Sequence, residues 1–199
     1  MLTGMGRENA EKAVKYIVKE YSPDFALSIG FGGALYGGAV IGEIVWGSRV
    51  LLIQEDITET LELSHAVDTI GELPSNLAIR EGSILTLEKW MKKTDIKKIL
   101  SDEFSLPVCD METFFLAKCA IEKGLPFLAI RSVTDLIDEE IPREFLSVTD
   151  EYGRYRFSRA LTLILGKPRL LKDIVKIGRN SRVASNNLWR ATRSIIETL

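Results

Sequence analysis

Three segments of this chain combine residue types that could bind or transform a ligand. They are the glycine-dense residues 30–38, residues 108–112, which contain an aspartate and a glutamate, and residues 131–138, which contain an arginine, a threonine and two aspartates. Each is expected to follow a short apolar strand. Because ligands of open α/β sheets bind outside the carboxyl ends of the strands, the three segments are candidates for a single site.

The glycine segment reads Gly-Phe-Gly-Gly-Ala-Leu-Tyr-Gly-Gly. Glycines allow a ligand to approach the main chain closely. A dinucleotide fingerprint would require glycine at position 35 and then a helix, whereas the chain has Leu35 followed by more glycine. A dinucleotide site is therefore not favoured. A tight packed turn that binds nothing remains the alternative.

The second segment places Asp110 and Glu112 on either side of Met111, between a predicted strand and a predicted helix. A carboxylate there could accept hydrogen bonds from a vicinal diol such as the ribose hydroxyls. The alternative is helix capping, with Asp110 as the cap and Glu112 in the first turn.

The third segment follows the most apolar strand of the chain, residues 126–130, and contains Asp135. A carboxyl group at a strand end beside an apolar surface is suited to general-acid catalysis, because burial favours its protonated form. The alternative is an aspartate that only caps a loop.

The elements that would position these segments follow from hydrophobic spacing, glycine and proline. Alternation of helices and strands indicates an α/β protein with a mostly buried sheet. We predict helices over residues 7–21, 92–100, 112–123, 143–165 and 170–198, and strands over 25–29, 44–53, 78–87, 106–109 and 126–132, with a glycine loop over 30–42 and mainly loop with strand pieces over 54–75.

Composition limits the classes of function. The 199 residues correspond to one domain, and a net charge of −2 argues against broad nucleic-acid binding. The two cysteines form neither a disulfide framework nor a zinc site, and the single histidine, His65, is more typical of an incidental residue than a catalytic one. No apolar stretch is long enough to span a membrane and no signal peptide is recognised, so the cytoplasm is expected.

The last 35 residues are basic. Eight lysines and arginines there face only Asp173 and Glu197. A solvated helix face against an acidic body or a neighbouring subunit is one interpretation. Weak contact with an anionic membrane surface is the other.

Taken together, four segments resemble the nucleoside phosphorylase and nucleosidase superfamily, which includes purine nucleoside phosphorylases and methylthioadenosine/S-adenosylhomocysteine nucleosidases. They are residues 3–10, 29–45, 110–112 and 126–135. The resemblance implies a three-layer αβα sandwich with a central mixed, mostly buried sheet. It implies one domain over residues 1–199, with a basic helical extension from about residue 166 that is similar to the hopanoid-associated phosphorylase-like branch.

The resemblance also implies cleavage of the N-glycosidic bond of a purine-type nucleoside, by phosphate or by water. Asp135 would be the acid for the leaving base, and Glu112 would bind the ribose hydroxyls with Met111 packed on the sugar. The other implied substrate-binding residues are Met5, Phe31, Gly32, Gly33, Ser83, Ile84, Leu85, Arg131, Thr134 and Phe145. No cofactor or metal is implied, and inorganic phosphate is the alternative co-substrate.

Departures from the family pattern leave a second function open. The family's serine in the glycine segment is Phe31 here, and an arginine that some phosphorylases carry is Ser28. The segment that precedes Met1 in relatives, which carries the water-activating carboxylate of nucleosidases, is expected to be missing. A nucleoside-binding protein that kept the fold and lost catalysis is therefore the alternative. Relatives are usually dimers or hexamers, so a homo-oligomer is expected.

Overall fold

The computed structural model describes residues 3, 6–63, 79–100, 103–139 and 170–198. Along the chain, the elements are α1 (Arg7–Tyr21), β1 (Ala26–Ala34), β2 (Ile44–Ile53), β3 (Ile57–Glu62), β4 (Ile79–Leu87), α3 (Lys93–Ile99), β5 (Val108–Asp110), α4 (Thr113–Glu122), β6 (Phe127–Asp135) and α6 (Leu171–Ile196).

The strands form one mixed sheet in the order β3-β2-β4-β5-β1-β6. The pair β1–β6 is parallel, whereas β1–β5 is antiparallel. The first residues of β2 also pair with β6 in the antiparallel sense. The sheet therefore curls so that β2, near one edge, meets β6 at the other edge. The end of β1 lies between β5 and the end of β6, because Gly33 pairs with Cys109 on one side and with Asp135 on the other.

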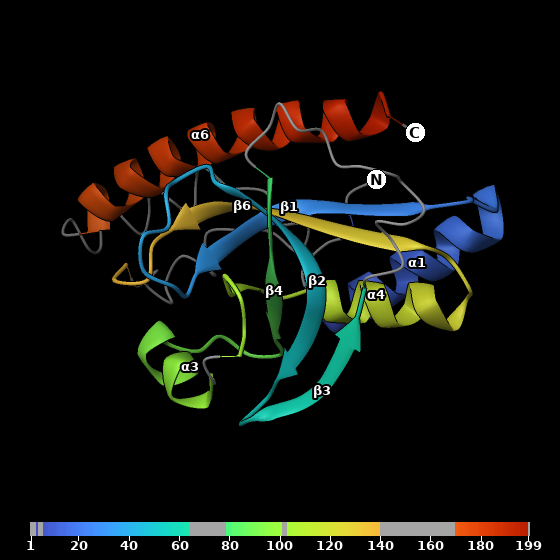
Figure 1. The fold of residues 1–199 in the computed structure, drawn as a ribbon, viewed down its shortest axis with the longest axis horizontal. Helices are drawn as coiled ribbons and strands as arrows, with labels where there is room; N and C mark the ends of the chain where they lie inside the picture. The colour runs from blue at the N-terminus through green and yellow to red at the C-terminus, as the bar shows by residue number, and fades with distance from the viewer. Residues whose placement is uncertain (1–2, 4–5, 64–78, 101–102, 140–169, 199) are drawn as a thin grey trace.

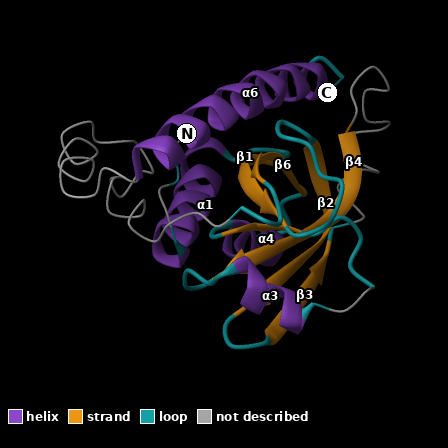
Figure 2. Ribbon diagram, turned by 90° about the vertical axis from the view of Figure 1, so that its left-hand side faces the viewer, coloured by secondary structure: helices purple, strands orange, loops and turns teal. Residues whose placement is uncertain are grey.

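Helices cover both faces of the sheet (Figures 1 and 2). On one face, α6 runs across β6 and β1. On the opposite face, α4 packs on the sheet and α1 packs on α4. The expected three-layer αβα sandwich with a mixed, mostly buried sheet is therefore confirmed.

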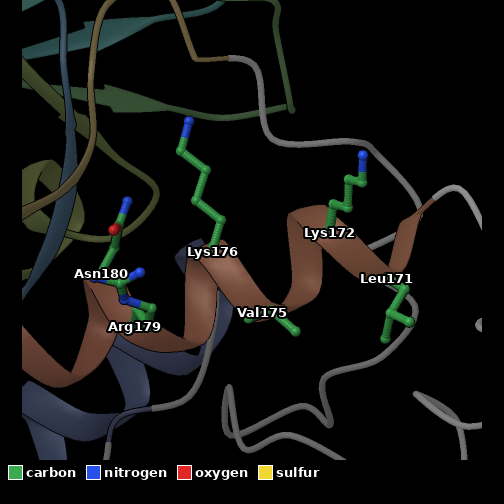
Figure 3. A pocket seen from close by; sticks show the side chains of 6 residues that line it. All are labelled: Leu171, Lys172, Val175, Lys176, Arg179 and Asn180. Carbon is green, nitrogen blue, oxygen red and sulfur yellow. The ribbon is translucent and has the colours of Figure 1, made fainter.

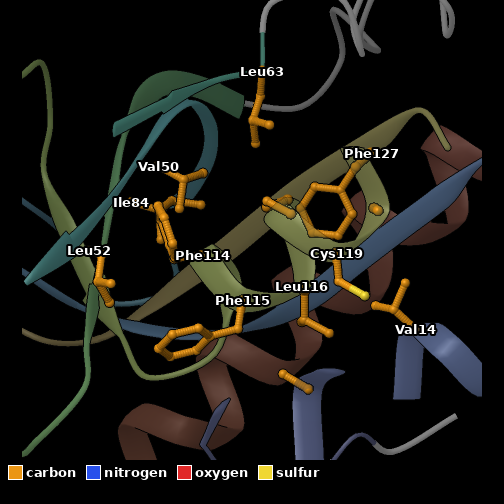
Figure 4. Packing of buried hydrophobic residues seen from close by; sticks show 14 of the residues in the cluster. Val14, Val50, Leu52, Leu63, Ile84, Phe114, Phe115, Leu116, Cys119 and Phe127 are labelled. Carbon is orange, nitrogen blue, oxygen red and sulfur yellow. The ribbon is translucent and has the colours of Figure 1, made fainter. Parts of the chain in front are cut away.

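The sequence of β6 explains why both faces are covered. Leu128 and Ile130 belong to the cluster under α6, whereas Phe127, Ala129 and Val133 belong to the larger cluster that includes α1 and α4 (Figure 4). A strand that buries side chains on both faces is a continuous apolar run rather than an alternating one. A third cluster joins Ile96 of α3 to β2 and β4.

Several predicted bounds are confirmed and two are wrong. The helix over 7–21 and the strand over 44–53 have the predicted ends. The predicted glycine loop over 30–42 is wrong in its first part, because β1 continues through its glycines to Ala34. Glycine suits a strand where neighbouring groups approach the backbone, as they do here. The predicted end of the last strand is also wrong, since β6 continues to Asp135.

Some predictions fall outside the described residues. They are the helix over 143–165, much of the segment 54–75, and the side chains Met5, His65 and Phe145. Within the part of the chain that is described, no helix combines the length and apolar character that a membrane span requires.

Candidate active site

Gly33 lies at the centre of the candidate site. It pairs with Cys109 on β5 and with Asp135 on β6, next to a register shift between Gly32 and Gly33. A Cβ atom on Gly33 would lie 2.5 Å from Asp135 Oδ2 and 3.2 Å from Cys109 Sγ. Glycine at this position therefore lets β5 and β6 bring their carboxyl-bearing ends against the same point of β1.

Asp135, the predicted acid, is buried and makes two side-chain contacts. Its Oδ1 accepts a hydrogen bond from Thr134 Oγ1 at 2.7 Å. Its Oδ2 lies 2.5 Å from Lys93 Nζ, and the two side chains are only 7% and 6% exposed. A buried charge is stable only when it is paired, and this pair compensates both charges.

Lys93 was missed by the sequence analysis. It lies in a lysine-rich stretch where neither its type nor its flanking residues separate it from Lys92 or Lys97. One signal was present: Lys93 is three residues before the buried Ile96, so the two share a face of α3. A lysine on the apolar face of a short helix indicates a buried counter-charge.

Glu112 also lies in a secluded position. One of its carboxylate oxygens accepts a hydrogen bond from the Gly6 backbone N–H at 3.0 Å. Burial and, after it, the neighbouring charge of Asp110 raise the pKa of Glu112 to about 7, against the lowering effect of the Gly6 hydrogen bond. Near neutral pH this carboxyl is therefore divided between its protonated and ionised forms.

Asp110 caps the start of α4 as the alternative interpretation expected, but the rest of that interpretation is wrong, because Glu112 is the N-cap residue and does not lie in the first turn. Its carboxylate accepts hydrogen bonds from the backbone N–H groups of Glu112 at 3.4 Å and of Thr113 at 3.3 Å. Glu112 itself is the residue before α4 and makes no side-chain cap hydrogen bond. The two carboxylates are therefore separated in function: Asp110 holds the start of α4, and Glu112 is turned toward Gly6.

Arg131 is structural support rather than an open ligand. Its Nε donates to Asp110 Oδ2 at 2.8 Å, with both side chains 4% exposed. Its terminal nitrogens donate to Ser28 Oγ at 3.0 Å and to Thr113 Oγ1. This buried network ties β1, β5, β6 and α4 together beneath the candidate site. The Ser28 hydroxyl thus accepts a hydrogen bond from this guanidinium.

Cys109 pairs with Gly33 on the neighbouring strand β1. Burial raises the pKa of its thiol to about 12, and the charge of Asp135 acts in the same direction. The thiol is therefore neutral at physiological pH, which suits a small packing residue and not a nucleophile.

The other predicted site residues are divided. Phe31 is 45% exposed on β1, and Thr134 and Met111 are partly buried near the strand ends. Ser83, Ile84 and Leu85 lie on β4 beside β5, but they are buried in the core, at 3%, 0% and 0% exposed. In this structure those three residues support β5 and offer almost no surface to a ligand.

The N-terminal half of α6 lines a groove next to the end of β6 (Figure 3). Asn180 donates to the Thr134 carbonyl oxygen at 3.0 Å, and Lys176 pairs with Glu139 at 2.6 Å. The basic tail helix thus fixes the segment around Asp135 in place. The residues that line the groove are Leu171, Lys172, Val175, Lys176, Arg179 and Asn180.

Gly33 pairs with Asp135 on one side and with Cys109, three residues before Glu112, on the other, and the described part of the chain contains no metal-binding cluster. Glu112 can accept hydrogen bonds from hydroxyl groups, and Asp135 can accept hydrogen bonds from a heterocyclic N–H. The two carboxyls therefore differ in their surroundings, since Asp135 has a cationic partner and Glu112 has a backbone N–H.

Curated proteins of known name are similar to this chain over most of its length. The methylthioadenosine/S-adenosylhomocysteine nucleosidase of Shewanella loihica is 23% identical over 181 residues, which cover 81% of this chain and 78% of the relative. The corresponding protein of Shewanella sp. MR-7 is 25% identical and covers 87% of this chain and 80% of the relative.

Solved structures share the fold. Futalosine hydrolase of Helicobacter pylori superposes with a TM-score of 0.67 at 13% identity, covering 99% of this chain and 78% of that one. The Neisseria meningitidis nucleosidase in complex with methylthio-immucillin-A gives 0.66 at 17% identity, with coverage of 99% and 79%. The sequence model of the phosphorylase superfamily matches residues 1–164, and the chain belongs to that superfamily.

Proposed function

We propose that this protein hydrolyses the N-glycosidic bond of a purine-type nucleoside. Asp135 binds the imidazole edge of the leaving base, and Glu112 binds the ribose hydroxyls. The observation that carries the proposal is the position of Gly33, which pairs with Asp135 on one side and with Cys109, three residues before Glu112, on the other. The names of the two curated relatives described above, both nucleosidases, support the same reaction.

The reaction balances without a cofactor. The C1′–N9 bond breaks, its electron pair goes to the purine, and the ribosyl carbon takes the hydroxyl group of water. The remaining proton of water ends on the base. Asp135 stabilises the base N–H as it forms, and Glu112 holds the sugar while positive charge develops on the ring.

Two charge pairs favour water over phosphate as the acceptor. Lys93 and Arg131 lie beside Gly33 and Gly30, within 3.1 and 3.4 Å of where a Cβ on each glycine would be, and each is ion-paired with a buried carboxylate. A phosphate dianion is held best by cations whose charge is not already compensated. In the described residues around the glycines, the positive charge is compensated, so we expect hydrolysis.

The test is base release from adenosine, inosine, methylthioadenosine and S-adenosylhomocysteine, with and without phosphate. We expect release that does not depend on phosphate, and loss of about 100-fold or more in rate for Asp135→Asn. Asp138→Asn, an exposed aspartate three residues on, is the matched control. An unchanged rate in Asp135→Asn would refute the role of Asp135, and strict phosphate dependence would refute hydrolysis.

Binding without turnover is the second candidate function. It is favoured by the contacts that both carboxylates already make, Asp135 with Lys93 and Glu112 with the Gly6 backbone. Calorimetric binding of a nucleoside or base by the wild type, without release of base over hours, would establish this function in place of hydrolysis.

We further propose a homo-oligomer. Ile29 and Phe31 of the inner strand β1 are 50% and 45% exposed, and two large apolar side chains spaced two residues apart on one face of a strand suit contact with a partner. Light scattering after size-exclusion chromatography measures this directly, and a monomer at micromolar concentration would refute it.

Weak membrane-surface contact through the basic α6 stays a prediction, to be measured by sedimentation with anionic vesicles.

A further inference from the structure

Lys93 is the buried cation of the candidate site. It is the first residue of α3, a helix of 7 residues that is anchored by only two buried side chains, Lys93 and Ile96. Its Nζ lies 2.5 Å from Asp135 Oδ2. Because Ile96 already supplies an apolar anchor, a lysine is not needed here merely to attach the helix.

The hydrogen-bonding capacity of the Lys93 ammonium is fully used. An ammonium group has three N–H donors. In addition to Asp135 Oδ2, Nζ lies 3.2 Å from the Asp135 carbonyl oxygen and 2.5 Å from the Leu136 carbonyl oxygen. Lys93 therefore has no donor left for a ligand.

The Asp135 carboxylate is correspondingly fixed as an acceptor. Lys93 holds Oδ2, and Thr134 Oγ1 donates to Oδ1 at 2.7 Å. Gly33 packs against the Asp135–Lys93 ion pair, since a Cβ on Gly33 would lie 2.5 Å from Asp135 Oδ2 and 3.1 Å from Lys93 Cε. The remaining lone pairs of Asp135 can accept hydrogen bonds, but the carboxylate has nothing to donate.

We propose that Lys93 is a positioning residue that selects the leaving base through Asp135. The inference rests on the proposed function, in which Asp135 meets the imidazole edge of a purine. On that edge the group at C6 lies beside N7: an amino group donates a hydrogen bond, whereas an oxo group only accepts one. An acceptor-only carboxylate therefore binds a 6-aminopurine and opposes a 6-oxopurine.

Removal of Lys93 reverses this selection. A carboxyl group buried without a counter-charge takes up a proton, because the low-dielectric surroundings penalise its ionised form. In Lys93→Met, Asp135 would then carry an O–H group that can donate to a 6-oxo oxygen. A buried polar group discriminates strongly against a ligand that leaves it without a hydrogen-bond partner, so we expect a large change in the preference between 6-amino and 6-oxo purines.

The experiment compares adenosine with inosine, and methylthioadenosine with methylthioinosine; the members of each pair differ in the C6 substituent and in the proton that the 6-oxo form carries on N1. For the wild type we expect kcat/KM to favour the 6-amino member by tenfold or more, and in Lys93→Met we expect this ratio to fall by tenfold or more. Lys92→Met, the exposed neighbour, is the matched control and keeps the wild-type ratio. Circular dichroism and a thermal melt check that each variant folds.

A second variant and a second readout keep the inference testable. Lys93→Gln is neutral and still has a donor for Asp135 if Lys93→Met does not fold. Calorimetric affinity for free adenine and hypoxanthine replaces rates if catalysis is lost. A folded variant with an unchanged amino-to-oxo ratio overturns the role of Lys93 alone, as does a wild type that prefers the 6-oxo member. A wild type that neither cleaves nor binds any of these compounds overturns the proposed function as well.

Discussion

Glu112→Gln should stabilise the protein at alkaline pH and leave it unchanged in acid. The pKa of Glu112 is raised from 4.5 to about 7, chiefly by burial. A difference of one in pKa corresponds to about 1.4 kcal/mol, so the ionised carboxylate costs the folded chain up to about 3 kcal/mol. Glutamine mimics the protonated carboxyl and keeps an oxygen that can accept the Gly6 N–H.

The direction of this pH dependence of stability follows from the number of protons that the folded and unfolded chains bind. Between the unfolded pKa near 4.5 and the folded pKa near 7, the folded chain binds more protons than the unfolded chain. In the wild type, the contribution of Glu112 to the free energy of unfolding is therefore fully present below pH 4.5 and is lost as the pH rises to about 7. The Gln variant has no such loss, so its advantage grows over that window and is constant above it.

The assay is urea unfolding at pH 4.5, 6, 7 and 8, with the free energy of unfolding extrapolated to water. We expect the variant to match the wild type at the lowest pH and to exceed it by up to about 3 kcal/mol at pH 8. Glu122→Gln, on the exposed end of α4, is the control and should show no such trend. A difference that does not vary with pH, or that has the opposite sign, would refute the burial argument.

Three further predictions concern the same site. Nucleoside affinity should rise about tenfold from pH 6 to pH 8 as Glu112 ionises and its oxygens become acceptors for both hydroxyls, measured by calorimetry. Gly33→Ala should destabilise the chain by about 1–3 kcal/mol and abolish base release, because its Cβ would lie 2.5 Å from the carboxylate that ends β6, whereas Gly37→Ala has nothing within 4 Å and should be neutral in thermal melts. Asp110→Asn should lower stability by about 3–5 kcal/mol in urea unfolding, since it leaves the buried Arg131 without its counter-charge; a loss below 1 kcal/mol would contradict this.

The parts of the fold that could be predicted are those with a local pattern. The apolar spacing and the Ser22-Pro23 stop defined α1, and a dense run of valine, isoleucine and leucine defined β2. The carboxyl ends of β5 and β6 were predicted as ligand sites from the acidic residues that follow apolar strands. Such patterns depend on residues within one or two turns of each other, so the chain alone contains them.

What the sequence left wrong or open depends on contacts between residues that are distant along the chain. The glycines of β1 were predicted as a loop because glycine weakens isolated strands, yet here they are required by Cys109 and Asp135 on the neighbouring strands. The separate roles of Asp110 and Glu112 were also left open, because capping and ligand binding need the same residue types. The two roles are distinguished by a contact 106 residues away in the sequence: the Gly6 backbone N–H donates a hydrogen bond to the Glu112 carboxylate.

The sequence by itself therefore determined the α/β class, the superfamily pattern and the carboxyl groups that could act. Only the tertiary structure decided how those groups are paired. Lys93 reaches the Asp135 backbone across 42 residues of sequence, and Arg131 reaches Ser28 across 103. Charge pairing in a low-dielectric interior depends on distance in space, and no periodicity along the chain encodes which lysine among several becomes the buried one.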